Sequence, residues 1–329
     1  MRRNQLIRFA GACLGMALLI LDGQTAVKGA AEGVELALRT LVPSLFPFLF
    51  LSILLTSSYL GGDHPLLRPI GRIFHVPNGG ETLLITAFLG GYPAGAQSVA
   101  EAWHSGQITK EQGEKLLAFC SNAGPSFLFG MTAAFFPEGW MVWILWLFHI
   151  LGAMAAAQVF LCPTDNYRTQ KATRNMTVTD ALLRSIRVMA VICGWVILFR
   201  VLIAFLDRWF LWLLPATAQT CVIGILELSN GICQLSQIED VRIRFLVCSG
   251  ILSLGGLCVA MQTSSVTSGL RQRYYYWGKL IQCTVSIALS AALFYEEFRF
   301  LPLILLISFG IWKKAVAFPR PMVYNEANQ

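Results

Sequence analysis

The sequence contains little charge. Asp, Glu, Lys and Arg make up 13% of its 329 residues, hydrophobic residues make up 56%, and the mean hydropathy is +0.61. A soluble globular domain carries about 25% charged residues. The composition therefore excludes an ordinary soluble domain and indicates a protein that is embedded in a lipid bilayer.

The motifs of common catalytic and metal sites are also missing. The sequence has no phosphate-binding loop, no dinucleotide-binding glycine pattern and no hydrolase triad spacing. Its nine cysteines include no Cys-x-x-Cys pair, and most lie in apolar segments, where cysteine packs as a small hydrophobic residue. We therefore predict that the protein is not an enzyme and holds neither a metal nor a cofactor.

What the chain has instead is long uncharged sequence. About 20 apolar residues cross the hydrocarbon core as one helix, so several of these runs are long enough to span a membrane. They predict an all-α polytopic membrane protein with about eight transmembrane helices. The runs are 40–62, 116–137, 139–164, 209–226, 280–295 and 300–312.

Basic residues mark one side of the membrane. The net charge of +7 is concentrated in loops, where it encodes orientation and gives no reason to expect a nucleic-acid partner. Arg2, Arg3 and Arg8 precede a first apolar helix at 6–21 that no small-residue cleavage site follows, so we predict an uncleaved helix with a cytosolic N-terminus. The other segments predicted to be cytosolic are 162–187, 242–244, 271–279 and 313–320.

Two glycine-rich segments interrupt the apolar sequence. "LGGYPAGAQ" (89–97) and "LGGLCVAMQ" (254–262) align at an offset of 165 residues, which indicates an internal repeat. Non-helical backbone at membrane depth survives only where it is buried in protein or lines a wet cavity, and a matched pair is typical of a transporter's binding site. We therefore predict two re-entrant helical hairpins, 82–100 and 245–270. For the first, a proline-kinked spanning helix is the alternative.

Polar side chains gather in two further segments. In "FCSNAGPSF" (119–127), a proline frees the carbonyl of Ser121, and Asn122 is costly to leave unpaired in an apolar bundle. In "LELSNG" (226–231), Glu227 is an intramembrane carboxylate, which indicates a functional site by default. The alternative role for Glu227 is a structural partner of Arg200.

The segment "GGYPAGAQSVAEAWHSGQITKEQGEKLLAFCSNAGPSFLFG", together with "LELSNG…LSLGGLCVAMQ", resembles the YlbJ sporulation integral membrane proteins. The resemblance covers roughly residues 35 to 310. That family carries the nucleoside-recognition Gate domain twice and is similar to concentrative nucleoside transporters. The resemblance implies a role in endospore formation, in which dipicolinate passes from mother cell to forespore through the outer forespore membrane.

In the nucleoside transporters, the solute is held by two hairpin tips and the two broken helices beside them. Carried over by motif, this implies Gln97, Ser98, Asn122, Glu227, Asn230, Gln262 and Thr263. The candidate solute-binding set also includes Gly90, Gly91, Ser121, Gly255 and Gly256, whose backbone groups are freed by the turns. Leu257-Cys258 stands where the first segment has Tyr92-Pro93, so the two tips are not chemically equivalent.

The expected organisation has five parts. They are an N-terminal helix and linker (1–33), a first Gate-like repeat (34–164), a basic cytosolic loop (165–187), a second repeat (188–316) and a polar tail (317–329). The loop charges place four crossings between the hairpins and so put both on the cytosolic face. The nucleoside transporters differ, because their hairpins enter from opposite faces. The alternative is that 186–206 lies along the membrane interface, which would restore that inverted arrangement and place the basic residues of 242–279 outside.

Three classes of function compete. The first is a transporter of a small anionic solute, which is dipicolinate by resemblance; the second is a nucleoside or nucleobase transporter. The third is a non-transporting assembly protein, against which the polar residues at the broken segments argue. The partners expected are the bilayer and the solute, while a second copy of the chain and other sporulation membrane proteins stay open.

Overall fold

The computed structural model describes residues 2–59, 66–77, 79–162, 177–305 and 307–308, and within them it contains helices and turns but no strand. The predicted multi-pass class is confirmed, because five stretches are long and apolar enough to cross a membrane: Gly23–Leu54, Gly139–Val159, Val178–Trp209, Val241–Val266 and Arg273–Phe294. Most of the basic loop 165–187, the segment 313–320 and the tail 317–329 lie outside the described residues.

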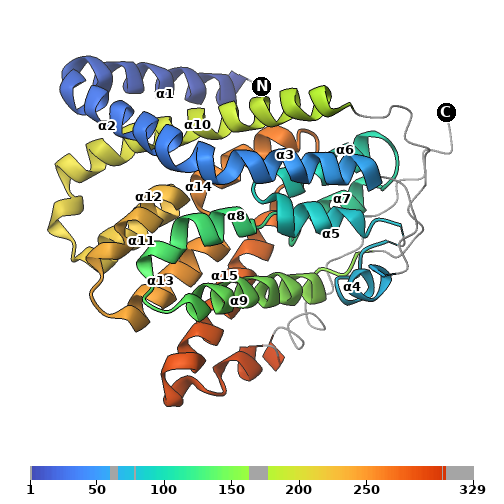
Figure 1. Cartoon of the computed structure of the whole chain (residues 1–329). Coiled ribbons are helices and arrows are strands. Elements are labelled where there is room, and N and C mark those ends of the chain that lie inside the picture. The colour runs from blue at the N-terminus through green and yellow to red at the C-terminus, as the bar shows by residue number, and fades with distance from the viewer. Residues whose placement is uncertain (1, 60–65, 78, 163–176, 306, 309–329) are drawn as a thin grey trace.

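The chain begins with a helical layer along one side of the molecule (Figure 1). Its elements are α1 (Arg2–Leu21), α2 (Gly23–Leu36), the π-helical turn η1 (Ala37–Leu41) and α3 (Val42–Tyr59). α2 packs along the long helix α10 (Val178–Trp209), and a Cβ at Gly33 would lie 2.9 Å from the Cα of Ile197. Arg200 forms its ion pair there with Glu32, so Arg200 is not the partner of Glu227.

The first glycine-rich segment is a hairpin, as predicted. After α4 (Arg68–Ile73), its legs are α5 (Thr82–Ile85) with the π-helical turn η2 (Thr86–Gly90), and α6 (Ala94–His104). The legs touch, since a Cβ at Gly95 would lie 2.7 Å from the Cα of Ala87. Gly91 turns the chain at the tip with φ +73°, which favours glycine. We call residues 82–104 the first hairpin.

A broken helix and an unbroken one complete the first half. The broken one consists of α7 (Lys110–Leu116), a non-helical stretch at 121–124, then α8 (Pro125–Phe127), the π-helical turn η3 (Leu128–Thr132) and η4 (Ala133–Phe135). Pro125 supports the break because a proline at the first position of a helix loses no hydrogen bond. We call residues 110–135 the first broken helix; α9 (Gly139–Val159) follows it.

The second half repeats this order, with its hairpin in an unexpected place. After η5 (Leu211–Leu213), the legs α11 (Ala216–Leu226) and α12 (Leu228–Cys233) fold against each other, and a Cβ at Gly231 would collide with the backbone of Gly224. We call residues 216–233 the second hairpin. The elements after it are η6 (Gln234–Gln237), α13 (Val241–Leu254), α14 (Gly256–Val266), α15 (Arg273–Phe294) and η7 (Glu296–Phe298).

The prediction of a hairpin at 245–270 is wrong. α13 packs mainly on α15, α11 and α9, whereas α14 packs on α10, α11 and α6, so the two halves are not the paired legs of a hairpin. They form one stretch, Val241–Val266, that is long enough to cross and is interrupted at Gly255, where φ is +77°. We call it the second broken helix. In the structural repeat, the glycine turn at 91 therefore matches Glu227, and the break at 121–124 matches Gly255.

The correction changes the topology. Between the hairpins lie the first broken helix and two helices long enough to cross, α9 and α10. With all three as crossings, the hairpins would enter from opposite faces. Figure 1 shows α5 and α6 at the right and α11 and α12 at the left. Hydrogen bonds at both ends show that the two broken helices run antiparallel. The N–H of Arg271 donates to Glu114 near the start of the first broken helix (3.1 Å), and Arg244 donates to the carbonyl of Phe135 at its end (2.8 Å).

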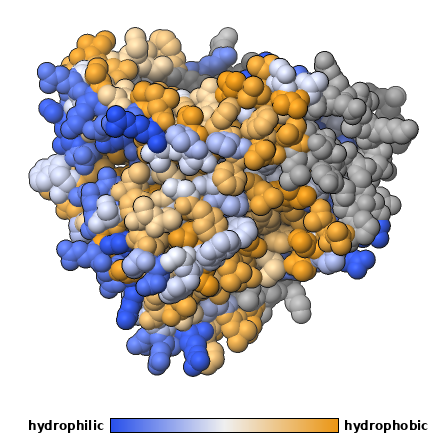
Figure 2. All heavy atoms as spheres, viewed as in Figure 1, coloured by the Kyte–Doolittle hydropathy of each residue, from blue (hydrophilic) through white to orange (hydrophobic). Residues whose placement is uncertain are grey.

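The stretch Val241–Val266 between 242–244 and 271–279 is long enough to cross a membrane, which argues against the predicted location of these two segments on one face. The positive charges of Arg242 and Arg244 are balanced locally by Glu239 and Asp240, and Arg244 is used to bind helix-end carbonyls. The exterior fits a bilayer: Trp143, Leu198 and other large apolar side chains are exposed, and Figure 2 shows apolar residues across the middle with hydrophilic ones gathered at the left edge.

Candidate functional site

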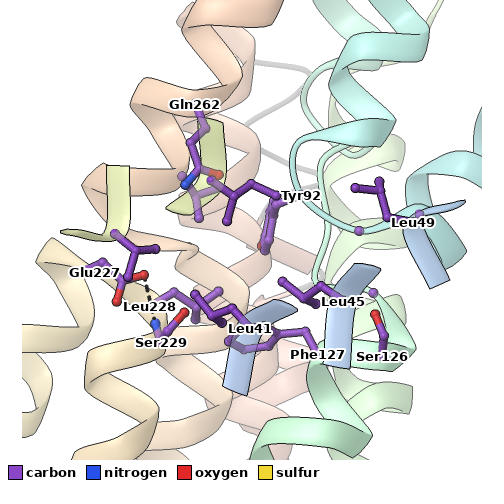
Figure 3. A pocket seen from close by; sticks show the side chains of 16 residues that line it. Leu41, Leu45, Leu49, Tyr92, Ser126, Phe127, Glu227, Leu228, Ser229 and Gln262 are labelled. Carbon is purple, nitrogen blue, oxygen red and sulfur yellow. Dashed lines mark hydrogen bonds between the residues drawn. The ribbon is translucent and has the colours of Figure 1, made fainter. Parts of the chain in front are cut away.

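Both hairpin tips and both broken helices meet at a small cavity (Figure 3). Its volume is about 40 Å³. Because one water needs roughly 10–15 Å³ of such space, the cavity has room for a few water molecules and for no ring-sized solute. Its lining comes from α3, both tips, both broken helices and α10, and includes Leu41, Leu45, Leu49, Gly90, Gly91, Tyr92, Gly124, Ser126, Phe127, Ile192, Val196, Glu227, Leu228, Ser229, Val259 and Gln262.

Glycine lets the backbones approach each other around this cavity. A Cβ at Gly91 would lie 3.0 Å from the amide nitrogen of Gly124, so the first tip rests on the first break. A Cβ at Gly256 would lie 2.8 Å from the carbonyl oxygen of Gly224, so the second break rests on the end of α11. Helices α6, α8 and α14 begin at these contacts, and their first N–H groups carry the positive end of the helix dipole.

Glu227 lines the cavity, but its oxygens are used within the second hairpin. Its carboxylate accepts hydrogen bonds from the amides of Ser229 (3.0 Å) and Asn230 (2.7 Å) and from the Asn230 side chain (2.7 Å). Glu227 is therefore the N-cap of α12, with its own backbone extended at the tip. Glu227 occupies the tip position that Gly91 occupies in the first hairpin. Its turn is stabilised by side-chain hydrogen bonds, whereas the turn at Gly91 uses a left-handed backbone conformation.

The other predicted residues divide into two groups. Gly90, Gly91 and Gln262 line the cavity, while Ser121 and Thr263 are buried beside it with their hydroxyl oxygens 3.4 Å apart. Gln97 and Ser98 do not line it. The side chain of Gln97 instead donates to the exposed Glu101 on the same helix (3.1 Å).

Asn122 belongs to a buried polar cluster behind the cavity. Its side chain donates to the carbonyl of Phe119 (2.7 Å) and accepts from the amide of Gln282 on α15 (3.0 Å). His149 on α9 accepts from the amide of Ala123 (3.1 Å), so the neighbouring helices satisfy the unwound backbone. These hydrogen bonds stabilise the non-helical backbone of the first break by satisfying its buried polar groups.

Sequence reasoning missed four residues of this region: Tyr92, His149, Lys279 and Gln282. Lys279 was predicted to lie in a cytosolic loop, but it is 2% exposed on α15, and its ammonium donates to Gln282 (2.7 Å) and to the hydroxyl of Tyr92 (3.2 Å). Only a weak pattern in the sequence pointed to the burial of Lys279. Lys279 and Gln282 are three residues apart, on one face of a helix that continues into the uncharged run 280–295.

The described residues offer no group of three His, Cys, Asp or Glu side chains that could hold a metal ion. The site is thus built from backbone ends, one carboxylate that caps a helix, one lysine and neutral hydrogen-bonding groups. These groups offer hydrogen-bond donors and acceptors that a polar solute could use.

Comparison with known proteins finds one informative similarity. The chain is 32% identical over 145 residues to the sporulation integral membrane protein YlbJ of Bacillus subtilis (strain 168), and the aligned part covers 42% of this chain. The chain spans about a third of the length of this curated relative (35%). No family model and no solved structure matches. The similarity supports the resemblance stated above and agrees with the integral membrane class.

Proposed function

We propose that this protein is a membrane transporter of a small anionic solute, which it binds between the two hairpin tips. The observation that carries the proposal is the meeting of both hairpin tips and both broken helices at one small cavity. Transporters with inverted repeats bind their solute near the bilayer midplane, at discontinuous helices whose amino ends point toward anionic groups.

The physiological context follows from similarity. The relative in Bacillus subtilis is named for sporulation, and this supports a role in endospore formation for the present chain. We extend the proposal to dipicolinate as the solute and to the outer forespore membrane as the site of action. Dipicolinate is a flat dianion, and its carboxylates suit the helix amino ends around the cavity and the lysine buried next to Tyr92.

The hydrogen bonds of Glu227 leave its carboxylate little capacity to accept from a nucleoside. A nucleoside is neutral and would use the carboxylate as an acceptor for its ribose hydroxyls. The oxygens of Glu227 already accept three hydrogen bonds from Ser229 and Asn230. The experiment therefore compares the proposal with two alternatives. They are nucleoside transport and a non-transporting role in membrane assembly.

The test is uptake into proteoliposomes that contain the purified full-length chain. Labelled dipicolinate and labelled uridine are compared, each with and without a pH gradient, and protein-free liposomes serve as the control. We expect saturable uptake of dipicolinate and none of uridine. Uptake of uridine alone would contradict the proposed solute class, and uptake of neither would support the assembly role.

A further inference from the structure

Lys279 is a basic side chain buried inside the molecule. It extends from α15, is 2% exposed, and lies between the first hairpin tip and the neighbouring turn of its own helix. Its ammonium donates to the side-chain oxygen of Gln282 at 2.7 Å and to the hydroxyl of Tyr92 at 3.2 Å, and it lies 5.0 Å from the centre of the Tyr92 ring. All of these partners are neutral.

No carboxylate of the described residues forms an ion pair with Lys279. The ion pairs among those residues are elsewhere, on α2, α7, α10 and the end of α6. Glu227, the buried acid at the cavity, instead caps α12. A charge buried without a counter-charge is costly, and Lys is almost never fully buried unless it is paired. The described residues thus give Lys279 hydrogen-bond acceptors but no counter-charge, so an anionic partner for its amine would have to come from outside them.

Tyr92 separates this charge from the cavity. It lies at the tip of the first hairpin, between Gly91 and Pro93, and its side chain lines the cavity at the centre of Figure 3. Its hydroxyl accepts from Lys279 and donates to the carbonyl of Leu252 at 3.0 Å, at the end of α13. The phenol oxygen therefore occupies the point where an acceptor that entered from the cavity would meet the ammonium.

We propose that Lys279 pairs with a carboxylate of the transported solute, and that Tyr92 takes the place of this carboxylate when the site is closed. A carboxylate accepts the same N–H that the phenol oxygen accepts, and it adds a charge-assisted interaction that the neutral phenol lacks. Movement of the first tip would enlarge the cavity and uncover Lys279 in one step. This proposal rests on the proposed function and specifies its solute as a carboxylate.

The test compares two ligands of one shape. Pyridine-2,6-dicarboxylate carries two charges, and pyridine-2,6-dicarboxamide is its neutral counterpart. Binding to the full-length chain in detergent is measured by calorimetry, together with thermal unfolding of each variant. The variants are Lys279→Gln, Lys279→Arg and Tyr92→Phe. Lys110→Gln, which removes an exposed lysine at the start of α7, is the matched control.

We expect the wild type to prefer the dicarboxylate by at least about tenfold, as is typical of a charge-assisted hydrogen bond. Lys279→Gln should abolish this preference, whereas Lys279→Arg and Lys110→Gln should keep it. Tyr92→Phe should strengthen binding of the dicarboxylate about threefold or more, because it removes the neutral competitor for the ammonium, and should leave the dicarboxamide unaffected. This variant leaves Lys279 itself intact and so decides the question even if Lys279→Gln does not fold.

Two results would overturn the inference while leaving the proposed function standing. One is an unchanged dicarboxylate preference in a folded Lys279→Gln. The other is weaker dicarboxylate binding in Tyr92→Phe than in the wild type. If the wild type binds neither ligand, or binds the dicarboxamide as tightly as the dicarboxylate, transport of an anionic carboxylate is itself contradicted and the inference is rejected with it.

Discussion

The guanidinium of Arg244 lies 2.8 Å from the carbonyl oxygen of Phe135, so the start of the second broken helix is fastened to the end of the first. Through Nε, the same group also donates to the carbonyl of Ile238 at 2.8 Å. Carbonyls at helix ends have no partner within their own helix, and a basic side chain satisfies them well. One arginine thereby joins the two repeats on one face of the membrane.

Replacing Arg244 by Gln should lower the free energy of unfolding by about 1–3 kcal/mol, because the helix-end carbonyls lose a charged donor. Thermal unfolding of the protein in detergent measures the change. Arg242→Gln is the control, since Arg242 is exposed on the same helix. Equal stability of the two variants would show that the link between Arg244 and Phe135 contributes nothing.

The topology predicts opposite labelling of two arginine positions. Arg242 and Arg271 are both exposed and lie at opposite ends of the second broken helix. In a chain whose nine native cysteines are replaced, Arg242→Cys and Arg271→Cys should react with a membrane-impermeant thiol reagent from opposite faces. Reaction of both from one face would restore the arrangement predicted from the loop charges.

The glycines at the cavity should tolerate no side chain. Gly91→Ala and Gly256→Ala should each destabilise the protein by about 1–3 kcal/mol, because both positions have positive φ (+73° and +78°) and face backbone atoms. Gly194→Ala on α10 is the matched control, since a Cβ there would meet nothing within 4 Å and should raise stability by up to about 1 kcal/mol. Thermal midpoints distinguish the two classes, and equal midpoints would contradict the tight packing.

Because Glu227 caps α12 in the second hairpin, substitutions at Glu227 should destabilise the protein to different extents. Glu227→Ala removes all three hydrogen bonds and should cost about 2 kcal/mol, whereas Glu227→Gln keeps an acceptor oxygen and should cost about half as much. Glu239→Gln, an exposed acid beyond the same hairpin, should cost nothing. If Glu227→Gln and Glu227→Ala unfold at the wild-type temperature, the carboxylate does not hold the tip.

The sequence predicted the first hairpin because its signal is local. Three glycines and a proline at 90–95 cannot form a regular helix, and the bilayer allows such backbone only inside the protein. The second hairpin carried no such signal, because a side-chain carboxylate satisfies the amides at its tip. The shared "LGG" of 89–91 and 254–256 was misleading: the same letters form a hairpin tip in one half and a break in a crossing helix in the other.

Part of the site could be predicted, and part depends on tertiary contacts. Asn122 and Glu227 stood out because polar groups in apolar sequence need partners. Lys279 did not, because Arg271 and Arg273 just before it made it look like the end of a basic loop. Its burial depends on Tyr92, 187 residues earlier in the chain, and on the helix end that Tyr92 contacts. No local pattern encodes such a distant relationship.

The three π-helical turns among the described residues all lie in the first half of the chain. η1 and η2 supply Leu41 and Gly90 to the cavity wall, and η3 begins directly after Phe127, so all three border the site. A π turn holds one surplus residue, and passing this residue along the helix rotates the segment beyond it by about 100° without unwinding it. The described elements of the second half contain no π turn. Register shifts of this kind are therefore available to the helices of the first half and not to the described helices of the second half.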